Sequence, residues 1–153
     1  MMNNKRMIGR QRLDERLSAL KPGSRFAVPP KGWVRAIRDA LGMSAIQLGA
    51  RLGVKPQSVA DLEKSEALGT IQLKTLRKTA EALDCTLVYA LVPNSSLEDI
   101  VQKRARDLAR KELARIGHSM DLEAQGLSKT EREAQIDGYI REHLRERDLW
   151  ERP

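Results

Sequence analysis

Four polar side chains in one predicted helix have the chemistry to contact nucleic acid: Lys55, Gln57, Ser58 and Asp61. The amide of Gln57 can bond an adenine edge in bidentate fashion, and the hydroxyl of Ser58 can bond either purine. Asp61 can accept a hydrogen bond from a cytosine amine or offset positive charge on its own helix. Lys55 can contact a phosphate. Together, the four side chains predict a helix that binds in the major groove of double-stranded DNA.

The stretch from Met43 to Glu63 supplies the two helices that would position these side chains. Ser44 is a good N-cap for the first helix, and Gly53 ends it because glycine readily adopts a positive φ. Pro56 begins the second helix, where its missing amide costs nothing. Gly49 lies inside the first helix, where glycine costs about 1 kcal/mol relative to alanine. We therefore expect a close crossing at Gly49 and a helix-turn-helix.

Apolar residues at helical spacing predict one further helix on each side of this pair. The two apolar stripes are Trp33, Ile37 and Leu41 upstream, and Ile71, Leu73, Leu76, Ala80 and Leu83 downstream. The alternative interpretation of the central pair is an ordinary helical hairpin with a solvated polar face.

Four helices of this length and order resemble the XRE, or lambda-repressor-like, DNA-binding domain, over Lys31 to about Asp84. The family's turn glycine is Gly53 here, and its apolar anchors are Leu48, Val59 and Leu62. Ala45 stands where the family usually has a phosphate-contacting glutamine. The candidate DNA-binding residues are Arg35, Ser44, Arg51, Lys55, Gln57, Ser58, Asp61, Lys64 and Lys74, with Arg38 as a further cation.

The composition is that of a helical protein whose ligand is a polyanion. The 153 residues are 41% hydrophobic and carry a net charge of +7, which favours a polyanionic partner without choosing between DNA, RNA and an acidic protein. Aromatic residues are only 3%, which argues against a single-strand binder built on base stacking. The single cysteine, Cys85, indicates a buried thiol in a reducing cytosol. Without an apolar run of about 20 residues or a signal-peptide pattern, we expect a soluble, cytoplasmic protein that does not engage a membrane.

The expected fold class is all-α with one added β-strand. The segment 85–92 is rich in β-branched and aromatic residues and is followed by Pro93. Since an unpaired apolar edge is a liability, we expect this strand to pair with its copy in a homodimer that reads a palindromic operator. The alternative is a strand lying alone beside the core. The predicted dimerisation residues are Thr86, Leu87, Val88, Tyr89, Ala90, Leu91 and Val92.

The chain is predicted to have three parts. Residues 1–30 are a basic N-terminal helix and a linker, and the leucines of this helix are expected to pack on the main domain. The alternative is that its basic end also contacts phosphates. Residues 31–93 are the helix-turn-helix domain with its strand, and residues 94–153 are a helical tail. Capping boxes are expected at Ser95 with Glu98 and at Ser128 with Glu131.

Within the tail, Ser119 and Glu123 would stand one turn apart on a helix. This pair resembles the inhibitory helix of antitoxins that restrain Fic-family toxins, although Ala124 replaces the family's Gly or Asn. The stretches GWVRAIRDALGMS, LVYALVP and HSMDLE together are similar to mobile mystery protein A, an XRE-type family paired with a Fic-domain protein. The resemblance implies an antitoxin that represses its own operon and places Glu123 against the nucleotide site of a Fic-domain toxin.

Two other functions are consistent with parts of the pattern, whereas a third, an enzyme, is not. A stand-alone repressor of a phage or mobile element would use the tail only for dimerisation. A purely structural adaptor would lack salt-dependent DNA affinity. An enzyme is disfavoured, because the two histidines, His118 and His143, have no metal-ligand spacing and no glycine-rich phosphate loop is present. We therefore expect no catalytic residue, metal or cofactor.

Overall fold

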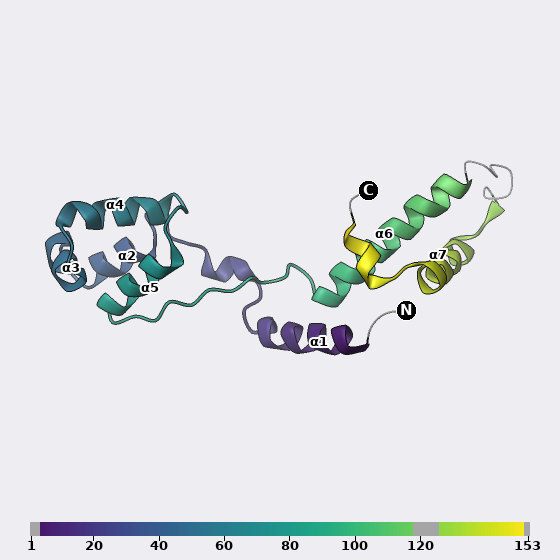
Figure 1. Ribbon diagram of the computed structural model, residues 1–153, viewed down its shortest axis with the longest axis horizontal. Coiled ribbons are helices and arrows are strands. Elements are labelled where there is room, and N and C mark those ends of the chain that lie inside the picture. The colour runs from purple at the N-terminus through teal and green to yellow at the C-terminus, as the bar shows by residue number, and fades with distance from the viewer. Residues whose placement is uncertain (1–3, 118–125, 152–153) are drawn as a thin grey trace. The chain divides into compact units, whose positions relative to one another are not determined.

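The computed structural model describes residues 4–117 and 126–151 of the chain. It divides into two compact units. The central unit is Ser24–Leu91, and the terminal unit combines Met1–Gly23 with Val92–Pro153. Figure 1 shows α2 to α5 grouped in the central unit, and α1, α6 and α7 in the terminal unit. The DNA-binding candidates therefore lie in a unit inserted between α1 and α6.

The central unit is a bundle of four short helices around an apolar core. They are α2 (Trp33–Ala40), α3 (Ala45–Leu52), α4 (Pro56–Ala67) and α5 (Leu73–Ala82), preceded by the 3-10 turn η1 (Gly23–Phe26). Val34, Leu48, Val59 and Leu83 are the buried residues of this core, and every helix adds half-buried apolar neighbours. The arrangement confirms the four helices predicted from the apolar stripes.

The turn between α3 and α4 has the predicted local structure. The Ser44 hydroxyl accepts a hydrogen bond from the Gln47 amide at 3.2 Å, and the Gln47 side chain accepts one from the Ser44 amide at 2.7 Å. Gly53 ends α3 with φ 70°, a left-handed conformation in which a Cβ would be strained. Pro56 is the first residue of α4. These three residues set the start and end of α3 and the start of α4.

Gly49 permits the close approach expected at the middle of α3. A Cβ added there would lie 2.7 Å from the Val54 carbonyl oxygen and 3.5 Å from Val59 Cγ2. The tightest contact is thus with backbone of the turn, and the α4 side chain is slightly further away. Because glycine alone leaves this space, its helix-propensity cost is offset by close packing.

The terminal unit packs α1 (Asn4–Ser18), α6 (Leu97–Gly117), α7 (Lys129–His143) and the 3-10 helix η3 (Glu146–Trp150). Its apolar core is Val101, Ala105 and Leu149. No residue of α1 is buried, although Leu17 is half-buried, and polar contacts of Arg10 join the helix to α6 and η3. Burial would lower the pKa of Arg10, but hydrogen bonds to Glu98 and Glu146 outweigh it and raise that pKa.

The start of α6 differs by one residue from the prediction. Ser96, rather than Ser95, accepts the hydrogen bond, from the Asp99 amide at 2.9 Å, and the Asp99 carboxylate accepts one from the Ser96 amide at 3.2 Å. Glu98 is not available for capping because it binds Arg10 at 2.6 Å. The second predicted capping box, Ser128 with Glu131, is confirmed.

The predicted β-strand at 85–92 is wrong. Residues 84–93 have no helix or strand assignment, and no strand occurs anywhere in residues 4–117 and 126–151. Within that part of the chain, residues 86–92 make no backbone hydrogen bond. The physical reason is that β-forming side chains do not create a strand without a neighbouring segment to receive the backbone hydrogen bonds.

Among the described residues, no helix is both long enough and apolar enough to cross a membrane.

Candidate nucleic-acid interface

Helix α4 turns one face into the core and the other outward. Val59, Glu63 and Glu66 are buried, at the i, i+4 and i+7 spacing of one helix face. The opposite face is exposed, and its polar side chains are Gln57, Ser58, Asp61 and Lys64. The residues predicted to meet base edges are therefore accessible, as contact with a DNA groove requires.

An ion pair inside the central unit fixes α4 to α2. Arg38 Nε lies 2.6 Å from Glu63 Oε1, and Arg38 Nη2 lies 3.2 Å from Glu63 Oε2. A third hydrogen bond runs from Arg38 Nη1 to the Met43 carbonyl at 2.8 Å. The hydrogen bond to Glu63 raises the pKa of Arg38. The interpretation of Arg38 as a phosphate-binding cation is therefore wrong, because its guanidinium is committed to these partners.

A second acidic residue of α4 holds the start of α2. The Glu66 carboxylate accepts hydrogen bonds from the Trp33 and Val34 amides at 2.8 and 2.9 Å. Gly32 precedes them with φ 86°, and a Cβ there would lie 2.7 Å from Glu66 Oε2. No sequence signal pointed to this cap, because Glu66 lies more than thirty residues from the amides that it binds. The Glu66 carboxylate therefore fixes the C-terminal half of α4 against the start of α2.

All nine sequence-predicted DNA-binding residues are exposed. They occupy α2 (Arg35), the start and end of α3 (Ser44, Arg51), α4 with its N-cap (Lys55, Gln57, Ser58, Asp61, Lys64) and the first turn of α5 (Lys74). Five also have side-chain contacts within the unit, one of them Ser44 in its capping box with Gln47. Arg35 pairs with Asp39, Arg51 donates to the Ala82 carbonyl, and Gln57 donates to Asp61 at 3.3 Å. Their individual roles on DNA stay predictions.

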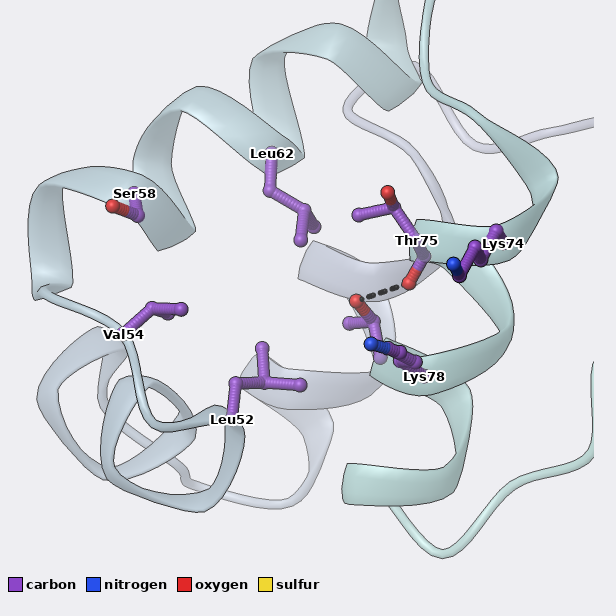
Figure 2. A pocket seen from close by; sticks show the side chains of 8 residues that line it. Leu52, Val54, Ser58, Leu62, Lys74, Thr75 and Lys78 are labelled. Atoms are coloured by element: carbon purple, nitrogen blue, oxygen red, sulfur yellow. Dashed lines mark hydrogen bonds between the residues drawn. The ribbon is translucent and has the colours of Figure 1, made fainter.

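Two grooves flank α4. One, with a volume of 370 Å³, is bounded by α3, α4 and α5 (Figure 2), and its lining residues are Leu52, Val54, Ser58, Leu62, Lys74, Thr75, Lys78 and Thr79. The other has a volume of 290 Å³, and its lining residues are Pro30, Lys31, Arg35, Ala60, Glu63, Lys64 and Ala67. Lys31 and Lys78 were not singled out by the sequence, because only the packing of the helices brings them beside α4.

The central unit exposes a surplus of positive charge around α4. Residues 24–91 contain ten Lys and Arg against six Asp and Glu. Three of the six acids are used internally, since Asp39 and Glu63 pair with arginines and Glu66 caps α2. Because each of these ion pairs cancels one arginine and one acid, the segment keeps its surplus of positive charge, which favours a polyanionic ligand.

No group of acidic, histidine or cysteine side chains in the described part of the chain has the arrangement of a metal site. The proposed inhibitory pair, Ser119 and Glu123, lies outside the described residues.

Residues 34–89 match the helix-turn-helix family HTH_3. This segment is an XRE-like helix-turn-helix domain, a DNA-binding type, and the match extends from α2 through the extended segment after α5. No curated protein matches the chain, and no solved structure does.

Proposed function

We propose that this protein is a transcription regulator that inserts α4 into the major groove of double-stranded DNA. The observation that carries the proposal is the coincidence of the family match at residues 34–89 with an exposed polar face on α4. Gln57, Ser58 and Asp61 face the bases, while Lys55 and Lys64 contact phosphates. Arg38 and Glu66 position the helix and touch no DNA.

The proposal is tested by titrating the full chain with two labelled duplexes, one of random sequence and one taken from upstream of its own gene. We expect binding that weakens steeply between about 50 and 200 mM salt, and tighter binding to the upstream duplex. Gln57→Ala is expected to reduce that preference by about 1–3 kcal/mol while leaving the salt dependence unchanged. Gln135→Ala, which alters an exposed glutamine of α7, is the matched control. Salt-independent binding, or none, would contradict the proposal.

We further propose that two copies bind one operator. After α5 the chain is extended and exposes apolar side chains, with Val88 77% and Leu91 91% exposed. These side chains, with Tyr89 between them, would be covered by a second copy, which gives the two-fold symmetry suited to a palindromic site. The titration described above measures this directly, because we expect two chains per upstream duplex.

We also propose that the protein is an antitoxin for a Fic-domain toxin. The resemblance at Ser119 and Glu123 supports this proposal. Glu123→Gly is expected to release the toxicity of a co-expressed Fic partner while leaving DNA binding intact. Glu142→Gly, which changes an exposed glutamate of α7, is the control and should leave the toxin masked. If Glu123→Gly also leaves it masked, the stand-alone repressor becomes the better description.

A further inference from the structure

We infer that the groove between α4 and α5 seats the sugar-phosphate backbone of one DNA strand, and that Lys74 and Lys78 neutralise neighbouring phosphates there. This inference rests on the proposed function and adds where one strand lies. It also gives a role to Lys78, which is not among the DNA-binding residues predicted from the sequence.

The two lysines share one face of α5. They stand four residues apart, so their Cβ atoms are about 6 Å from each other, which lets two long side chains reach adjacent phosphates. Figure 2 shows both side chains extending from α5 over the groove, with Ser58 of α4 on the far side. Lys74 and Lys78 are exposed and form a charged rim, and the other lining residues include the apolar Leu52 and Leu62 and the buried Thr79.

Within the described residues, the positive charge of this rim has no acidic partner. Neither Lys74 nor Lys78 forms an ion pair with any residue in 4–117 or 126–151, although Glu81 lies only one turn beyond Lys78. By contrast, Arg35 and Arg38 are both paired with acidic side chains. Two adjacent cations without a counter-charge are stabilised by an anion, and a phosphodiester strand supplies regularly spaced anions.

The position of the groove relative to α4 identifies the occupant. A helix that enters the major groove, about 12 Å wide, has a phosphate backbone on each side. The Lys74 and Lys78 rim lies on one flank of α4, beside Ser58. Lys31 and Lys64 line the groove on the other flank, beside Ala60 and Ala67. Cations on both flanks match two backbones, and a small free anion would leave this symmetry unexplained.

The test is a salt series with the random and upstream duplexes, comparing the full wild-type chain with Lys74→Gln/Lys78→Gln. We expect the slope of log affinity against log salt to become shallower by about 2, and the loss of affinity between about 50 and 200 mM salt to be about tenfold smaller. Both duplexes should be affected equally, because phosphate contacts carry no sequence information. Arg77→Gln removes an exposed charge from the same helix outside the groove, and it should leave the slope unchanged.

The outcomes separate this inference from the proposed function. If the wild-type chain shows no salt-dependent binding, the proposed function itself fails. If the wild-type chain binds DNA but the double variant has the same slope as Arg77→Gln, only the inference that this groove binds the DNA backbone is overturned. Wild-type binding of inorganic phosphate that the double variant lacks, without any change in the DNA slope, would assign the groove to a free anion and also overturn it. Equal thermal melting of the variants and the wild type confirms that folding is intact.

Discussion

Replacing Arg38 by methionine is expected to lower the free energy of unfolding of the central unit by about 3–5 kcal/mol, since breaking a buried pair leaves an uncompensated charge. The Arg38 and Glu63 side chains are only 11% and 8% exposed, so water cannot replace the lost partner. The Met43 carbonyl would lose its hydrogen bond as well. Urea unfolding followed by Trp33 fluorescence, in a Trp150→Phe background, measures this unit separately.

Two further variants locate the cause of the Arg38→Met effect. Arg35→Met removes an exposed arginine of the same helix and should cost less than about 0.5 kcal/mol. Arg38→Met/Glu63→Leu removes both charges and should recover most of the lost stability, because an apolar pair of similar volume often replaces a buried ion pair without loss. A double variant as unstable as Arg38→Met would show that packing, and not the unpaired carboxylate, dominates.

Gly49→Ala is expected to destabilise the central unit by about 1–2 kcal/mol, although alanine is the better helix former. The added Cβ would meet the Val54 carbonyl oxygen at 2.7 Å, and backbone in a tight turn cannot move aside cheaply. The propensity gain of about 1 kcal/mol is therefore smaller than the cost of overpacking. The same Trp33 unfolding experiment measures the difference.

Gly138→Ala provides the opposite result as a control. Gly138 also lies inside a helix, α7, but a Cβ added there would meet nothing within 4 Å. We expect this substitution to stabilise the terminal unit by up to about 1 kcal/mol, measured by Trp150 fluorescence in a Trp33→Phe background. If both glycine substitutions stabilised their units, close packing at Gly49 would not be the reason for its glycine.

The sequence by itself determined the helix-turn-helix. Ser44, Gly53 and Pro56 act on amides and dihedral angles within one turn of themselves, so their effects are readable without knowing the fold. The exposed face of α4 was predictable for a similar reason, since the apolar anchors Val59 and Leu62 leave Gln57 on the opposite side. Both predictions depend on spacings of a few residues.

Only the tertiary structure decided what the charged residues do. In the sequence, Arg38 cannot be distinguished from a surface cation, because its partner Glu63 is 25 residues away. The flanking grooves, including the one that holds Lys78, form where separate helices meet. The β-forming segment 85–92 likewise depended on a backbone partner, which the described chain does not supply. Capping and helix propensity are local, whereas the pairing of charges, grooves and strands requires groups that only folding brings together.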